Sequence, residues 1–297
     1  GASYDQLPGF HKIHRNNICE IKQASYGSAY EAVNYNTGAV NQHTLVFQDP
    51  LTTANADMKL YHSGNILKNG QFVTSQAFTI AMWLNILQDN SNERCIIALG
   101  ADTTNNNKIA LGLGVGGGNA NLILRSYNTT SNGKWNSTSE LSVGNWYHVV
   151  VTFDGSSAQN DPIFYVDGVA QTTNEASTPG AAMALINSVN GGRSIIGAGN
   201  MGTTGAPPWR GLALDEIALY DTVLSATEVS QIYNNAGLLN LTSSIVAPKV
   251  SNLFTWLRMG DTKGTVNNAG SPSTGYYDLS GSNTALSSSY STTSLNG

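Results

Sequence analysis

Charged residues are scarce in this chain of 297 amino acids. Only 11% of the residues are Asp, Glu, Lys or Arg, against roughly 25% in an average soluble protein. Asn, Ser, Thr and Gly are plentiful instead. The surface must therefore be neutral and rich in amides and hydroxyls. Such a surface suits a secreted, cell-surface or virion protein that meets sugars or copies of itself, and it fits poorly with a charged cytosolic enzyme.

Extended basic clusters and long apolar runs are also missing. The net charge is −5, and a face that binds nucleic acid needs Lys and Arg gathered over a wide area, so we expect no nucleic-acid partner. The longest apolar runs fall far short of the roughly 20 residues of a membrane-spanning helix. We therefore expect no membrane insertion.

Cysteine is limited to Cys19 and Cys95, which lie far apart in the sequence. No Cys and His spacing typical of a zinc site is present. Nothing in the sequence supports a disulfide between the two, so we favour two thiols that are buried or lie at a strand edge. The cysteines therefore do not distinguish an oxidising from a reducing compartment.

The stretch from Leu141 to Gly168 carries the clearest structural signals that are present. Residues 146–153 are dense in β-branched and aromatic side chains and end at Asp154-Gly155, a pair that tolerates positive φ in a tight turn. Residues 163–166 repeat the pattern and end at Asp167-Gly168, which predicts a type I′ hairpin. Two strands and a hairpin follow from these residues alone.

Other runs of strand length are bounded by Asn, Gly, Ser or Asp and predict an antiparallel sandwich. They are residues 44–47, 78–86, 95–100, 108–114, 121–127, 194–199 and 212–220. The glycines of residues 112–118 are followed by no helical pattern, so we expect a hairpin or strand bend there rather than a phosphate-binding loop. Residues 105–107 and 128–136 are predicted loops.

One short helix is predicted near the end of this region. Ser225 and Glu228 have the spacing of a capping box, and apolar residues follow at helical intervals until Asn235-Ala236-Gly237. The spacing of the apolar residues changes here from every second residue to about every 3.6 residues. We therefore expect an all-β sandwich with one short C-terminal helix.

Several motifs resemble a known family in order and spacing. They are residues 78–83, 141–155, 164–169, 195–197, 211–220 and 224–229. Together they resemble the laminin-G-like jelly-roll modules of the concanavalin A-like lectin and glucanase superfamily. The resemblance covers residues 45–237 and implies an antiparallel jelly-roll β-sandwich with a concave face. Residues 1–44 would then be an extended N-terminal arm, a candidate docking segment, and residues 238–297 a C-terminal strand and tail segment.

The C-terminal segment resembles the opening of such a module, although it follows the helix. Residues 253–261 and 277–283 carry this likeness. Three alternatives are open: the segment adds an outer strand to its own domain, pairs with a neighbouring copy, or is a degenerate repeat.

The two ends of the chain resemble structural proteins of tailed phages, particularly marine ones. The likeness rests on the opening His11–Asn16 and on the trailing Trp256–Asp261. We take as candidate assembly or docking residues His11, Lys12, His14, Arg15, Trp256, Arg258 and Asp261. For the short basic cluster the alternative is a solvated strand edge, where cations discourage unwanted pairing, and we favour that alternative.

No catalytic residues are predicted. Glycosidases on the resembled fold carry carboxylates at alternate positions of one strand, because retaining hydrolysis needs two carboxyl groups about 5–5.5 Å apart. Asp215 and Glu216 are adjacent, so regular alternation would point them to opposite faces. Asp215 matches an Asp of the family motif and is expected to be a structural hydrogen-bond acceptor. His148 lies inside the most apolar strand, so we expect a buried, hydrogen-bonded histidine rather than a base. We predict that the protein is not an enzyme.

No cofactor is predicted, and no metal ligand is assigned. Some members of the resembled family bind calcium through loop oxygens, which this ion prefers. Asp154 and Asp167 are explained by their turns, and Asp102 has no second carboxylate beside it. Calcium therefore stays unassigned.

Sugar binding needs an exposed aromatic ring beside amide and hydroxyl partners. The candidate glycan-binding residues are Trp135, in a predicted polar loop with Lys134 and Asn136, then Trp209, then Tyr127. The alternative for each is a loop anchor packed on its own sheet, and we weigh the two equally. Trp83 and Trp146 are assigned to the core.

The leading hypothesis is a non-enzymatic virion structural protein, such as a capsid decoration, fibre or tail component, that displays a lectin-like jelly-roll module. Its partners would be other virion proteins, copies of itself and a surface glycan. The alternative is a secreted carbohydrate-binding or adhesion module. A degenerate glucanase is a weaker alternative.

Overall fold

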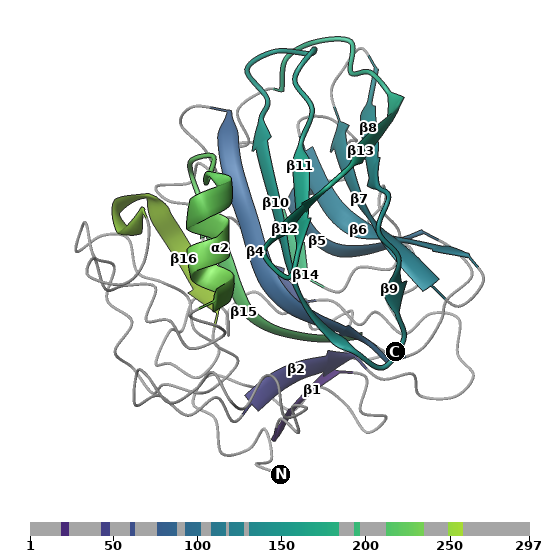
Figure 1. Ribbon diagram of the computed structural model, residues 1–297, viewed down its shortest axis with the longest axis vertical. Helices are drawn as coiled ribbons and strands as arrows, with labels where there is room; N and C mark the ends of the chain where they lie inside the picture. The colour runs from purple at the N-terminus through teal and green to yellow at the C-terminus, as the bar shows by residue number, and fades with distance from the viewer. Residues whose placement is uncertain are drawn as a thin grey trace.

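A computed structural model describes most of the predicted sandwich and parts of both flanks (Figure 1). The described residues are 19–23, 43–47, 60–62, 76–87, 93–101, 108–116, 119–127, 131–183, 193–196, 212–234 and 249–257. Within them the chain forms two eight-stranded sheets and one α-helix, which confirms the predicted antiparallel sandwich with one short helix. The strand pairs are antiparallel.

The first sheet, sheet A, has the strand order β1-β2-β15-β4-β10-β11-β12, with β16 also paired to β15. These strands are β1 (Cys19–Gln23), β2 (His43–Phe47), β15 (Leu212–Tyr220), β4 (Ala77–Ile86), β10 (Trp146–Asp154), β11 (Ile163–Val166), β12 (Val169–Gln171) and β16 (Leu253–Leu257). Strands β1 and β16 come from the two predicted flanks, so both flanks add strands to this sheet. The predicted domain boundaries at residues 44 and 237 stay predictions.

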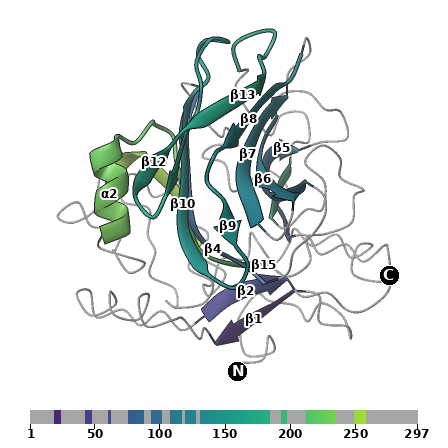
Figure 2. The same ribbon diagram turned by 45° about the vertical axis from the view of Figure 1, so that its right-hand side comes forward.

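The second sheet, sheet B, has the order β13-β8-β7-β6-β5-β14-β3, with β9 also paired to β7. These strands are β13 (Thr173–Ser177), β8 (Gly133–Ser137), β7 (Asn119–Tyr127), β6 (Lys108–Gly116), β5 (Arg94–Ala101), β14 (Arg193–Ile196), β3 (Leu60–His62) and β9 (Leu141–Ser142). Figure 2 shows the two sheets as separate layers.

The main core lies between the two sheets. It collects inward-facing side chains from both layers, among them Met82 and Leu84 of β4, Leu122 and Leu124 of β7, and Phe164 of β11, each at most 1% exposed. Fully burying an aliphatic or aromatic side chain of this size contributes about 1.5–3 kcal/mol. The core therefore fixes which face each strand turns inward.

The hairpin at Asp167-Gly168 forms as predicted. Both residues have positive φ, 50° and 76°, which is what a type I′ turn requires. Gly155, in the other Asp-Gly pair, is not among the described residues with positive φ. A glycine is needed there for close approach, because a Cβ at Gly155 would lie 2.6 Å from Cβ of Met183.

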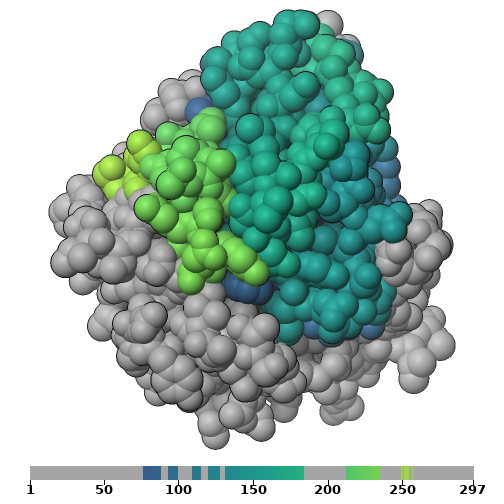
Figure 3. All heavy atoms as spheres, viewed as in Figure 1, coloured from purple at the N-terminus to yellow at the C-terminus, as the bar shows by residue number. Residues whose placement is uncertain are grey.

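The predicted helix is α2 (Ala226–Asn234). Its capping box forms as expected: the backbone N–H of Ser225 donates to Glu228 Oε2 at 2.8 Å, and that of Glu228 donates to Ser225 Oγ at 3.3 Å. Val229 and Ile232 then pack on the outer face of sheet A. Figure 3 shows the helix lying directly against the strands.

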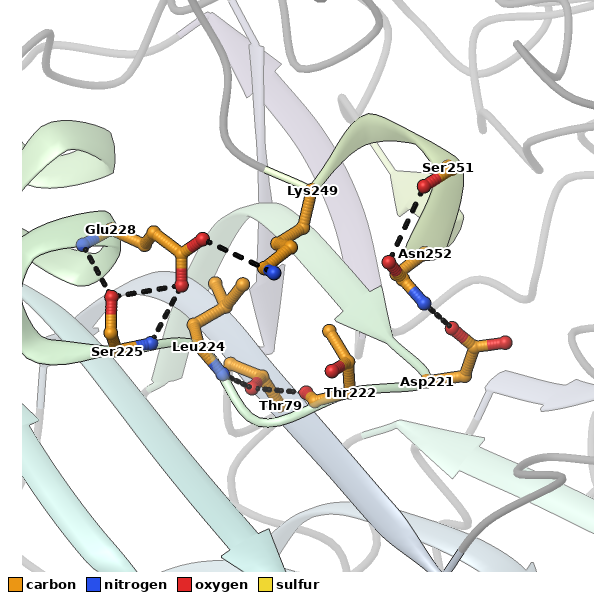
Figure 4. A network of polar contacts seen from close by, with 9 residues as sticks. All are labelled: Thr79, Asp221, Thr222, Leu224, Ser225, Glu228, Lys249, Ser251 and Asn252. Atoms are coloured by element: carbon orange, nitrogen blue, oxygen red, sulfur yellow. Dashed lines mark hydrogen bonds and ion pairs between the residues drawn. The ribbon is translucent and has the colours of Figure 1, made fainter.

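The C-terminal strand β16 is tied to the end of β15 and to the start of the helix. Trp256 pairs with Ala218 of β15. Before the strand, Asn252 donates to Asp221 Oδ1 at 2.9 Å, and Lys249 Nζ lies 3.8 Å from Glu228 Oε1 (Figure 4). Residues 253–257 therefore add a strand to the sheet of their own domain, and the rest of the predicted C-terminal segment after residue 257 lies outside the described residues.

Two tryptophans expected in the core differ in their burial. Trp83 is 7% exposed, as predicted, but it lies under the helix, where its ring centroid is 6.2 Å from that of Tyr233. Trp146 is only partly buried, so its assignment to the core is wrong. It opens β10, directly after residues 142–145, which are exposed.

His148 is buried beneath the helix, in the middle of an aromatic cluster. Its ring centroid lies 5.3 Å from that of Trp83 and 5.9 Å from that of Tyr233. The expectation of a buried strand histidine is confirmed, but the expectation of a hydrogen-bonded ring is not, because Nδ1 has no partner among the described residues. Burial lowers the pKa of His148 to about 3.

Acid should therefore loosen the packing of the helix on sheet A. The folded state holds His148 neutral down to a pKa of about 3, whereas the unfolded chain protonates it near 6.5, so stability is intact above pH 6.5 and falls as the pH drops below it. At about 1.4 kcal/mol per pH unit, we expect a loss of about 2 kcal/mol between pH 7 and pH 5. Urea unfolding at the two pH values measures it.

The variant His148→Phe is the control for this prediction. It should keep the aromatic packing and lose much of the acid sensitivity. Asp167 accepts a hydrogen bond from the backbone N–H of His148. Burial raises the pKa of Asp167 and outweighs the lowering effect of that hydrogen bond, so its contribution to the pH dependence of stability is opposite to that of His148. An unchanged pH dependence in His148→Phe would contradict the assignment.

Candidate functional site

A polar groove of about 550 Å³ lies on sheet B, mainly on the face turned away from the core. Its lining combines amides, hydroxyls and carboxylates with one lysine and a small apolar floor. The lining residues are Glu93, Gly114, Ala120, Asn121, Ile123, Lys134, Asn136, Ser137, Thr138, Glu140 and Asn174. They come from the β6–β7–β8–β13 side of the sheet.

Strand alternation places these side chains. Along β7, Leu122 and Leu124 belong to the core, so Asn121 and Ile123, which alternate with them, point to the opposite face. The same period of two applies to β8. The groove is therefore the polar reverse side of strands whose other side chains build the core.

Trp135 lies on β8 but faces the core, so the prediction that it is an exposed sugar platform is wrong. It is 0% exposed, its ring centroid is 5.1 Å from that of Phe153, and its indole N–H donates to Asp161 Oδ1 at 2.7 Å. The predicted loop over residues 128–136 is in fact a strand from Gly133 onward. Alternation turns the indole inward and its neighbours Lys134 and Asn136 into the groove.

Tyr127 is also not a sugar platform. It is 7% exposed and packs in a small cluster with Cys95, Ala98, Ala110 and Ile123. Burial raises the pKa of Tyr127 to about 12. Cys95 is a buried thiol, as expected.

The remaining candidate, Trp209, lies outside the described residues. The same holds for the candidate docking residues His11, Lys12, His14, Arg15, Arg258 and Asp261, and for Asp102.

Trp256 is described, and its prediction as a docking residue is wrong. It is 2% exposed, and its indole N–H donates to Glu216 Oε2 at 2.5 Å within the same chain. A side chain buried against its own sheet presents no surface to a partner.

The asparagine amides are the main polar groups of the groove that sequence reasoning missed. Asn136 on β8 and Asn174 on β13 are directly opposite in the strand register, so their side chains share one face. Asn136 is half-buried and Asn174 is exposed, and neither side chain hydrogen-bonds to another residue that the structure describes. Asn121 completes the set and donates to the carbonyl of Ser137 at 3.2 Å.

Gly114 makes room for the floor of the groove. A Cβ at this position would lie 2.6 Å from Asn121 Oδ1 and 2.6 Å from Ile123 Cδ1. The glycine-rich stretch forms a β6–β7 hairpin, as predicted, and here the missing side chain lets the next strand's side chains lie over the backbone.

Two residues of the groove lining, Glu93 and Lys134, form a charged triad with Arg125. Glu93 accepts a hydrogen bond from Lys134 through Oε1 and one from Arg125 through Oε2. Burial raises the pKa of Glu93, but the hydrogen bonds and positive charges of the two cations outweigh it, so the pKa lies below its usual value. Glu93 is therefore a firmly ionised carboxylate.

The acidic pair Asp215-Glu216 lies elsewhere, on β15. A β-bulge between Asp215 and Ala218 gives Glu216 a φ of 48° and interrupts the alternation of side chains. The expectation that regular alternation points these two side chains to opposite faces of the sheet is therefore wrong. Glu216 reaches Trp256. Asp215 accepts the backbone N–H of Glu216 at 2.7 Å, which confirms it as a structural acceptor. Both acids are buried.

Within the part of the chain that the structure describes, no group of three His, Cys, Asp or Glu residues is arranged to hold a metal ion. In the same residues, no helix has the length and apolar character to cross a membrane.

The comparisons with known proteins agree with this architecture. The family model for the concanavalin A-like lectin/glucanases superfamily matches residues 60–230. The chain belongs to this superfamily. The resemblance drawn from the sequence motifs is thereby confirmed. No curated protein sequence matches the chain.

Several solved structures resemble the chain at low identity. A native heptameric SAP-like pentraxin from Limulus polyphemus has 20% identity and a TM-score of 0.46, over 61% of this chain and 78% of the pentraxin. A putative carbohydrate binding protein from Bacteroides ovatus has 16% identity and a TM-score of 0.45, over 73% of this chain and 54% of that protein.

The enzymatically active domain of tailspike protein 2 from bacteriophage CBA120 has 16% identity and a TM-score of 0.49, over 88% of this chain and 35% of the tailspike chain. The chain thus spans about a third of that tailspike chain.

Proposed function

We propose that the protein is a carbohydrate-binding module and that the groove on sheet B holds the glycan. The observation that carries this proposal is the facing pair Asn136 and Asn174, two amides in a groove with no described partner of their own. An amide offers a carbonyl acceptor and two N–H donors, which matches the mixed donor and acceptor character of a sugar hydroxyl.

The groove's size and floor support the same proposal. A volume of about 550 Å³ lies within the range of roughly 300–1,000 Å³ usual for small-ligand sites. Thr138 adds an exposed hydroxyl to the lining, and Ala120 and Ile123, which are 3% and 2% exposed, form its apolar floor. This arrangement replaces the aromatic platform expected from the sequence.

Removing the two amides should weaken glycan binding without unfolding the protein. Each neutral hydrogen bond contributes about 0.5–1.5 kcal/mol, so we expect the double variant Asn136→Ala/Asn174→Ala to lose about tenfold or more in affinity. A glycan array followed by calorimetric titration of the best ligand measures this.

Asn234→Ala is the matched control, because Asn234 is an exposed asparagine on the helix that covers the other sheet. It should bind like the unchanged protein. Equal losses in both variants, or no glycan ligand for the folded protein, would contradict the proposal.

We further propose that the module binds glycans without cleaving them. A general acid needs a raised pKa, whereas Glu93 has a lowered one and both of its oxygens are engaged by cations. Asp215 and Glu216 are buried away from the groove. We expect no release of reducing ends when the protein is incubated with the glycans that it binds, and their release would overturn this proposal.

The setting that we propose is the surface of a virion, where the module would be a capsid decoration, fibre or tail component in contact with other virion proteins and with copies of itself. The low charge of the chain and the phage-like motifs at its two ends support this proposal. Mass spectrometry of purified particles should detect the chain. Its absence from particles and presence in the medium would favour the alternative, a secreted adhesion module.

A further inference from the structure

The cations beside the groove are held by a single carboxylate. Arg125 of β7 and Lys134 of β8 are directly opposite in the strand register, where two like charges repel each other. Glu93, just before β5, meets both of them, one with each carboxylate oxygen. All three side chains are partly buried, with 26%, 24% and 33% exposed for Arg125, Lys134 and Glu93.

This arrangement leaves the groove poorly suited to an anion. Among the described residues that line the groove, Lys134 is the one cation, and its ammonium group is bound to Glu93. The other charged lining residues, Glu93 and Glu140, are acidic. A sugar carboxylate or sulfate would have to displace Glu93 from its two cations, and it would meet negative charge on entering. A neutral glycan needs only the amides and hydroxyls.

We propose that Glu93 determines the charge selectivity of the groove, so that it takes neutral glycans and rejects glycans that carry a carboxylate or sulfate. This inference rests on the proposed function of the groove. Glu93 would be a specificity residue that acts indirectly, by holding the side chains of Lys134 and Arg125. Without the carboxylate, these two cations would stand side by side and form an anion-binding pair.

The test exchanges the carboxylate for an amide of the same shape. Glu93→Gln should gain about tenfold or more in affinity for oligosaccharides bearing a uronate or sulfate, because a hydrogen bond to a charged group is worth more than a neutral one. The probes are a neutral oligosaccharide that the unchanged protein binds and the same backbone carrying a carboxylate or a sulfate. The gained binding should weaken as salt is added.

Two variants serve as controls. Glu175→Gln removes the same charge from an exposed position of β13. Glu175 follows Asn174, so alternation turns its side chain away from the groove, and the variant should leave selectivity unchanged. The double variant Glu93→Gln/Lys134→Gln should lose the gained binding again, because one of the two cations is gone. Thermal unfolding of each variant establishes that it is folded.

The outcomes separate this inference from the function beneath it. Neutral binding by the unchanged protein, with a gain for acidic glycans in Glu93→Gln alone, supports the inference. A preference of the unchanged protein for acidic glycans, or no gain in the folded variant, overturns the inference and leaves the glycan-binding function standing. Binding of no glycan at all overturns both.

Discussion

The whole arrangement depends on burying one face of each sheet against the other. Because side chains alternate along a strand, filling the space between the sheets with residues such as Leu122, Leu124 and Phe164 also assigns every neighbouring side chain to an outer face. The groove on sheet B and the helix-covered face of sheet A are therefore consequences of the same core. A shift of β7 by one residue would bring Asn121 into the core and Leu122 into the groove.

The two outer faces have been used differently. Sheet A is covered on its outer face by the helix, and the outer side chains of the sheet, Trp256 of β16 among them, form a second apolar cluster with Val229. Even the polar groups on this side, His148 and the Asp215-Glu216 pair, are buried and serve packing or backbone contacts. Sheet B instead keeps a polar hollow on its outer side. The asymmetry explains why the binding proposals concern sheet B.

Two of the errors made from the sequence, those at Trp135 and Trp256, share one physical cause. Trp135 stands between a lysine and an asparagine in a stretch of poor strand formers, which is typical of a loop, and only pairing with β7 and β13 makes it a strand. Once it is a strand, alternation reverses the assignment: the indole is buried and Asn136 becomes exposed to the groove. Trp256 was misplaced for a related reason, since nothing local says that its segment pairs with β15. The alternation around Trp135 was present in the sequence and could have identified Asn136.

The sequence by itself determined the features that depend on neighbouring residues: the strands with their period of two, the Asp167-Gly168 turn and the capping box at Ser225 and Glu228. Only the tertiary structure decided which strands are neighbours. It brought Asn136 opposite Asn174 and placed Glu93 between Arg125 and Lys134. The reason is that strand pairing is set by the burial of the whole apolar surface, to which residues far apart in the chain contribute together.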